Sequence, residues 1–176
     1  MYVKNVILII FILLISSCTT KMNIENFANN KPELILEKYF DGEIIAWGYF
    51  HDRFGNLRRS FEVKINGKWD GQFLTLDEDF LYDDGEKQKR IWKIEKKSKK
   101  EYVGYADDVI GKANGVASGN ALNWSYDLSL EVKEKKIKVK FDDWMFLHEK
   151  GTLINRAEIS KFGITLGVVT ITFIKV

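Results

Sequence analysis

The feature that most constrains the fold of this chain is an alternation of apolar and polar residues in the sequence after residue 40. Phe61, Val63 and Ile65 alternate with charged residues, and the same pattern returns in residues 122–132 and 137–141. Because successive side chains of a strand point to opposite faces of a sheet, a period of two predicts half-buried strands. We therefore expect an all-β domain.

Turn signals separate the alternating runs and predict that consecutive strands form hairpins. Asn66-Gly67 is the strongest of these signals, because both residues tolerate the positive φ of a two-residue hairpin turn. Residues 32–39 are predicted to form a short helix ahead of the first strand. The expected strands cover residues 42–52, 58–66, 69–80, 87–96, 101–109, 120–132, 136–147, 152–161 and 166–175.

A series of consecutive hairpins leaves two sheet edges, and closing the sheet is the route that removes them. We therefore predict a lipocalin-like up-and-down antiparallel β-barrel of about eight to ten strands, with a β-sandwich as the alternative. The interior of such a barrel is either filled by side chains or open to one small ligand.

The N-terminal residues predict export and lipidation. Lys4 is followed by an apolar run over residues 6–15, about half the length that crosses a bilayer core of roughly 30 Å, so we expect a signal peptide rather than a transmembrane helix. Ile15-Ser16-Ser17-Cys18 resembles the lipobox of bacterial lipoproteins, in which the cysteine is acylated and becomes the first residue. Cys18 is the single cysteine of the sequence, which excludes an intrachain disulfide.

These observations divide the chain into three parts: a lipoprotein signal peptide (1–17), a lipidated N-terminus with a polar tether (18–33) and a β-barrel domain (34–176). Acyl chains on Cys18 anchor a protein to a membrane that it does not span. Thr19 stands where the lipoprotein pattern associates an aspartate with retention in the inner membrane. In a cell with two membranes, the expected location is therefore the outer membrane, facing the periplasm.

Charge and motifs exclude several classes of function. The 27 lysines and arginines nearly balance the 25 aspartates and glutamates, so no general attraction to nucleic acid is expected. No nucleophile elbow or phosphate-binding loop is visible. His51 and His148 lie far apart in the sequence and the single thiol is at the anchor, so we predict no metal site and no cofactor.

Aspartates beside large apolar residues are the candidates for a functional site. They are Asp79 before Phe80, Asp107-Asp108 before Val109, and Asp142-Asp143 between Phe141 and Trp144. In each adjacent pair, alternation sends one carboxylate outward and the other inward. An unpaired inward carboxylate is costly, so we expect it to meet Arg53, Arg156 or Lys161, or to have a raised pKa.

The residues predicted to contact a ligand are Trp47, Asp79, Asp108, Trp124, Asp142, Asp143, Trp144, Arg156 and Lys161. In one interpretation they form a polar cluster in an aromatic cavity, which orients the head group of an amphipathic molecule. In the other, the acids form a structural ion-pair network that fixes strand register and the tryptophans belong to the core.

A family resemblance extends over nearly all of the expected barrel. The residues that carry it are Tyr39-Phe40-Asp41-Gly42, Ala46-Trp47-Gly48, Asp52-Arg53-Phe54-Gly55, Trp69-Asp70-Gly71, Leu74 to Phe80, Tyr82 to Glu86, Ala106 to Gly111, Gly119 to Leu122, Phe141 to Met145, Asn155-Arg156-Ala157 and Ser160 to Gly163. They resemble an uncharacterised bacterial lipoprotein family, domain of unknown function 3833. The resemblance implies a lipoprotein and a barrel, and it implies no catalytic roles.

We expect a membrane-anchored envelope lipoprotein that binds or shields a hydrophobic molecule, fatty-acid or lipid derived. One alternative is a barrel enzyme of the isomerase or cyclase type acting on a lipid, for which Asp79, Asp108, Asp142 and His148 are the acid–base candidates. Another is an envelope scaffold with a protein partner. Of these classes, a binding module is favoured over an enzyme.

The lipidation prediction has a direct test. The substitution Cys18→Ser removes the sulfur that is expected to carry the lipid. It should abolish incorporation of labelled palmitate, because the hydroxyl of serine is a much poorer nucleophile than a thiolate. Persistent labelling of the variant would show that the lipobox assignment is wrong.

Overall fold

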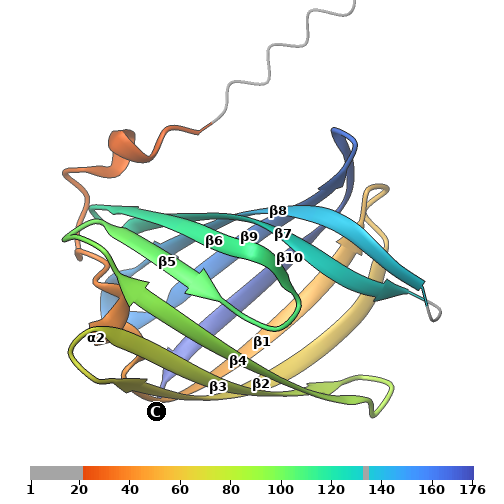
Figure 1. Cartoon of the computed structure of the whole chain (residues 1–176), viewed down its shortest axis with the longest axis horizontal. Coiled ribbons are helices and arrows are strands. Elements are labelled where there is room, and N and C mark those ends of the chain that lie inside the picture. The colour runs from red at the N-terminus through yellow and green to blue at the C-terminus, as the bar shows by residue number, and fades with distance from the viewer. Residues whose placement is uncertain (1–21, 133–134) are drawn as a thin grey trace, which may run out of the picture.

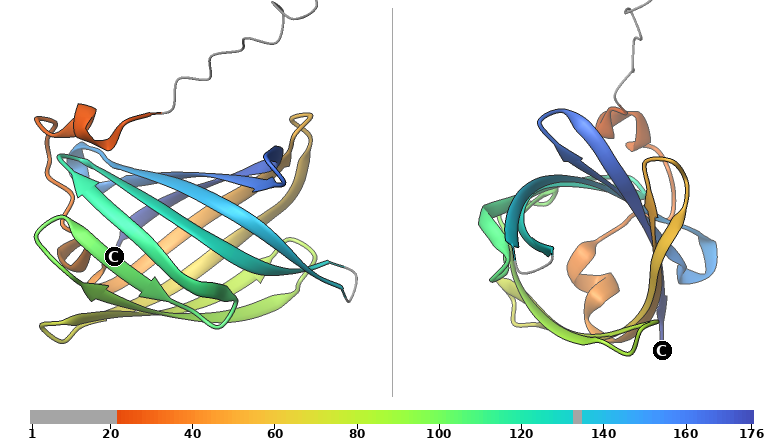
Figure 2. Two further views of the ribbon diagram at one scale, coloured as in Figure 1. Left: turned by 45° about the horizontal axis from the view of Figure 1, so that its top comes forward. Right: turned by 90° about the vertical axis from the view of Figure 1, so that its right-hand side faces the viewer.

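The strands form a closed antiparallel sheet in a computed structural model, which describes residues 22–132 and 135–176 (Figure 1). Each strand pairs with its neighbours along the chain, and β1 closes the ring by pairing with β10 (Figure 2). This confirms the predicted all-β barrel over the alternative sandwich. The expected signal peptide and Cys18 lie outside the described residues.

The ten strands of the barrel are β1 (Gly42–Asp52), β2 (Leu57–Trp69), β3 (Phe73–Tyr82), β4 (Lys87–Lys96), β5 (Glu101–Tyr105), β6 (Val109–Ser118), β7 (Ala121–Val132), β8 (Lys135–Leu147), β9 (Leu153–Lys161) and β10 (Ile164–Lys175). Among residues 22–132 and 135–176, three short helices accompany them: η1 (Ile24–Phe27), α2 (Leu36–Phe40) and η2 (Glu149–Gly151). Within the described part of the chain, no helix has the length and apolar character needed to cross a membrane.

Helix α2 lies across one end of the barrel, where Figure 2 shows it inside the ring of strands. Leu36 and Phe40 are buried there. The hydroxyl of Tyr39 donates to the carbonyl of Phe173 at 3.1 Å, and the carboxylate of Glu37 receives hydrogen bonds from Lys96 and Tyr102. Contacts to β4, β5 and β10 thus hold α2 as a plug.

The hairpin predicted at Asn66-Gly67 is wrong, because β2 continues through both residues to Trp69. Gly67 pairs with Gly42 on one side and with Leu76 on the other, in the middle of the sheet. A Cβ atom on Gly67 would lie 1.6 Å from the carbonyl oxygen of Phe40. The glycine is therefore needed for the close approach of α2, and not for a turn.

The β2–β3 turn lies instead at residues 70–72, where a side chain supplies the turn hydrogen bonds. The carboxylate of Asp70 accepts the backbone N–H groups of Gln72 at 2.9 Å and Phe73 at 2.7 Å. Gly71 has a φ of +103°, a conformation that favours glycine.

Strand β6 was missing from the predicted set, which had one strand over residues 101–109 and none over 110–119. The inward residues of β6 are small, namely Ala113, Gly115 and Ala117, so the strand shows no large apolar alternation. The ring of Trp124 occupies the space above Gly115, where a Cβ atom would lie 2.8 Å from it. The large side chain of Trp124 on β7 thus fills the space left by the small side chains of β6.

The plug can be tested at Gly67. We expect Gly67→Ala to lower the free energy of unfolding by about 1–3 kcal/mol or more, because the new methyl group displaces the end of α2. The exposed neighbour Lys68 gives the control, since Lys68→Ala should stay within about 0.5 kcal/mol of the wild type. Urea denaturation measures both, and equal stability of the two variants would contradict the close packing of α2.

Candidate functional site

The interior of the barrel holds a cavity of about 1220 Å³. Its lining extends from Phe40 of the α2 plug to Glu86 and Asp107, which belong to turns at the opposite end of the barrel. Small-molecule pockets usually enclose about 300–1,000 Å³, so this volume is ample for a drug-sized or lipid-sized ligand.

The half of the cavity nearest the α2 plug is apolar. Its lining residues are Phe40, Leu76, Ile94 and Phe173. Aromatic rings continue toward the middle of the barrel: Trp92 and Trp124 have centroids 6.4 Å apart, and Tyr126 stacks on Phe141 at 5.1 Å. This half is suited to the apolar part of a ligand.

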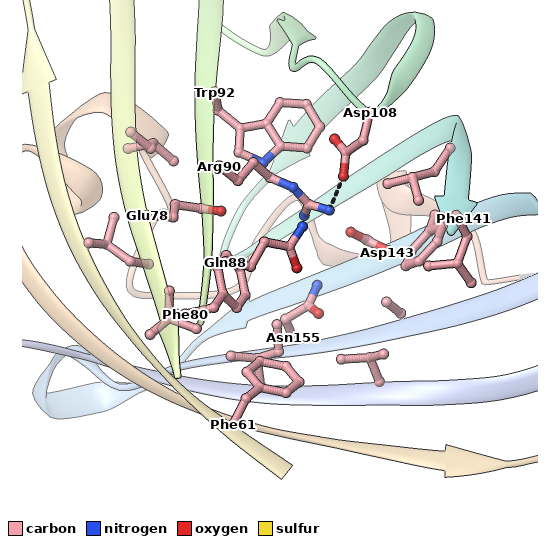
Figure 3. A pocket seen from close by; sticks show the side chains of 18 of the residues that line it. Phe61, Glu78, Phe80, Gln88, Arg90, Trp92, Asp108, Phe141, Asp143 and Asn155 are labelled. Carbon is pink, nitrogen blue, oxygen red and sulfur yellow. Dashed lines mark hydrogen bonds and ion pairs between the residues drawn. The ribbon is translucent and has the colours of Figure 1, made fainter. Parts of the chain in front are cut away.

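A set of polar side chains crosses the middle of the cavity, and we call it the polar belt. Its members are Glu78, Arg90, Asp108, Tyr126, Asp143 and Asn155, which come from β3, β4, the β5–β6 turn, β7, β8 and β9. Figure 3 shows most of these side chains around one space, with the ion pair between Arg90 and Asp108 dashed.

Glu78 and Arg90 are direct cross-strand partners on β3 and β4. Burial raises the pKa of Glu78 to about 7; the nearby charge of Arg90 opposes this effect, and that of Asp108 adds to it. Arg90 makes its hydrogen bond with Asp108, so a single guanidinium serves two carboxyl groups. The Glu78 carboxyl is therefore poised to change charge near neutral pH.

Asp143 and Tyr126 form the second polar contact of the belt. The Tyr126 hydroxyl donates to Oδ2 of Asp143 at 3.1 Å. Burial raises the pKa of Asp143 to about 7, against the opposing effect of this hydrogen bond and with a further increase from the charge of Asp142. Burial also raises the pKa of Tyr126 well above its ordinary value. At neutral pH, Tyr126 is thus a donor and Asp143 exists in both protonation states.

Among the predicted ligand-contact residues, Trp124, Asp108 and Asp143 line the cavity. In the Asp142-Asp143 pair, one carboxylate points inward and the other outward, as alternation predicts. The carboxylate of Asp142 accepts a hydrogen bond at 2.7 Å from Asn123, with which it lies on the outer face. Asp108 meets Arg90 rather than the expected Arg53, Arg156 or Lys161, whereas Asp143 follows the other expectation, because burial raises its pKa to about 7.

The remaining candidates lie outside the barrel. Trp47 is 41% exposed, and Asp79 contacts Lys89 on the surface. Trp144 is only 8% exposed because η1 covers it, with the Phe27 ring 5.9 Å away. Arg156 is exposed opposite Trp144 in the β8–β9 register, and Lys161 lies near the Phe162 ring at the β9–β10 turn.

Sequence reasoning did not single out Glu78, Arg90, Tyr126 or Asn155. A signal for them exists, because each occupies an inward position of an alternating run. Glu78 follows Leu74 and Leu76 at the same spacing, and Asn155 stands between Leu153 and Ala157. A polar residue that interrupts an apolar alternation is thus the pattern that marks the belt.

The fold and the cavity define a closed antiparallel β-barrel with a hollow, partly polar interior. A family model described as "Protein of unknown function (DUF3833)" matches residues 12–175, and the chain belongs to this family. This confirms the family resemblance of the motifs. No curated protein matches the chain with significant similarity.

The raised pKa values predict how stability depends on pH. Glu78 and Asp143 titrate near pH 7 in the folded protein, above their ordinary values of 4.5 and 3.8, so the folded state binds more protons than the unfolded state between these limits. The free energy of unfolding should therefore fall as pH rises from about 4 to about 7, by up to about 1.4 kcal/mol per pH unit for each group, and level off above.

Asp143→Asn should flatten this fall, because the amide does not titrate. The matched control is Asp79→Asn, which removes a carboxyl group from the outer face. Urea denaturation over this pH range gives the slopes, and equal slopes in the two variants would contradict the raised pKa of Asp143.

Proposed function

We propose that this chain is a membrane-tethered binding protein that holds a lipid-derived or other largely apolar molecule inside its barrel. The observation that carries the proposal is the cavity of about 1220 Å³ with an apolar half and a polar belt. Ligand sites commonly combine an apolar lining with a few polar groups that fix orientation.

The interior side chains favour a ligand over a filled core. Ala157 faces the cavity from β9, where a larger side chain would reduce the cavity volume. The apolar half offers a favourable transfer of about 0.8 kcal/mol for each methylene group that it buries. A chain of several methylenes therefore supplies the affinity, and the polar belt supplies the orientation.

The membrane tether in this proposal rests on the sequence pattern at residues 15–18. A lipid on Cys18 would keep the barrel beside a membrane, and this membrane would be the source of an amphipathic ligand. In a cell with two membranes, the proposed position is the outer membrane, facing the periplasm.

A second candidate function is acid–base catalysis on a bound lipid, of the isomerase or cyclase type. The observation that favours it is the presence of two cavity carboxyls, Glu78 and Asp143, with pKa values of about 7. Groups that titrate near the working pH are suited to transfer protons. Chemical analysis of lipid recovered from the protein separates the two candidates, because a binding protein returns its ligand unchanged.

The cavity can be tested by filling it. Val169 faces the cavity beside Ala157, so Val169→Trp places a large ring in the ligand space. We expect the wild type to retain lipid from an envelope lipid extract in native mass spectrometry, and the variant to retain at least about tenfold less, since the ring takes up volume that the ligand needs.

The matched control is Leu81→Trp, which adds a similar ring on the outer face of β3, where Leu81 is exposed. Circular dichroism checks that both variants keep the barrel. A wild-type protein that is repeatedly free of lipid, or equal lipid retention by the two variants, would contradict binding in the cavity.

A further inference from the structure

Two buried side chains face the cavity with hydrogen-bonding atoms that lack partners. Asp143 is 7% exposed; its Oδ2 accepts from Tyr126, and its Oδ1 has no partner among the described residues. Asn155 is 2% exposed, and its Nδ2 likewise finds no acceptor in the described structure. Unpaired buried polar atoms are costly, and a ligand that pairs both of them gains affinity.

The two side chains are close enough to act on one head group. Asp143 pairs with Ala157 and Met145 pairs with Asn155, so Asp143 and Asn155 are diagonal neighbours on the inner face of β8 and β9. Diagonal neighbours lie about 7–8 Å apart and point the same way, which leaves room for one small group between their polar atoms. Figure 3 shows both side chains pointing into the same part of the cavity.

A carboxylate head group does not fit this position. Above pH 7, where Asp143 is ionised, a carboxylate would accept from Asn155 but would face the anionic Oδ1 of Asp143. The charge of Arg90 is already balanced, because the guanidinium pairs with Asp108 and stands opposite Glu78, although its Nε has no hydrogen-bond partner among the described residues. With three carboxyl groups around a single guanidinium, the belt disfavours a further negative charge.

An ammonium head group satisfies only half of the arrangement. It would donate to Oδ1 of Asp143, but it has no lone pair to offer Nδ2 of Asn155. The buried amide would stay unpaired. A hydroxyl or an amide both donates and accepts, so either of these groups pairs both atoms at once.

We propose that Asp143 and Asn155 form a head-group subsite for an uncharged alcohol or amide carried on an apolar chain. The head group donates to Oδ1 of Asp143 and accepts from Nδ2 of Asn155, while Tyr126 holds Asp143 in place. This inference rests on the proposed binding function, and it adds a head-group class that the function by itself does not require.

Cavity tryptophans allow a direct test with three probes of one chain length. Trp92 and Trp124 line the cavity, so ω-brominated dodecanol, dodecylamine and dodecanoate should quench their fluorescence on binding. At mildly alkaline pH, where Asp143 is ionised, we expect the alcohol to bind about tenfold or more tightly than the other two probes, because it alone pairs both Oδ1 of Asp143 and Nδ2 of Asn155.

Two substitutions test whether the tighter binding of the alcohol depends on Asp143 and Asn155. Asn155→Leu removes the donor at similar size, so the alcohol should lose about tenfold in affinity while the amine changes little. Asp143→Asn exchanges the carboxylate for a neutral amide, which should raise the affinity for dodecanoate relative to the alcohol. Asn66→Leu, at an exposed position on the outer face of β2, is the control for the asparagine substitution.

The outcomes separate this inference from the proposed function. If dodecanoate or dodecylamine binds as tightly as the alcohol, or if Asn155→Leu weakens all three probes equally, the head-group inference is wrong and the binding function stands. If none of the probes binds to the wild type, the binding function fails with it.

Discussion

Pairing of β1 with β10 is the constraint on which the rest of the structure depends. Closure of the sheet pairs its first strand with its last, and it fixes for every strand which face turns inward. Once that choice is made, period-two alternation places one set of side chains in the interior and the other on the surface. The cavity, the polar belt and the outer surface all follow from this single choice of face.

The cavity is closed at one end of the barrel and open in its middle, and different residues cause each. Helix α2 fills one end of the barrel and is held there by Glu37, Tyr39 and the close approach to Gly67. The small inward residues of β6 accommodate the Trp124 ring, and Ala157 on β9 leaves space in the middle of the barrel. The result is a cavity with an apolar floor and polar walls.

The carboxyl groups of the polar belt have too few cations and hydrogen-bond donors around them. Burial raises the pKa of Glu78 and of Asp143 to about 7, and Arg90 is shared among carboxyl groups. Groups of this kind are costly in a core built only for stability, because an apolar side chain of similar shape avoids the loss of hydration. This cost favours a role in ligand recognition over a purely structural one.

The sequence by itself determined the all-β class, the closed barrel and the family, because alternation and turn residues are local properties. It also determined that one aspartate of the Asp142-Asp143 pair points inward. It misplaced the β2–β3 turn, since Gly67 is needed for the close approach of helix α2 and not for a turn. It also missed β6, whose small residues show no apolar alternation. Only the tertiary structure brought Arg90, Asp143 and Asn155 together, because their meeting depends on strand register around the closed ring.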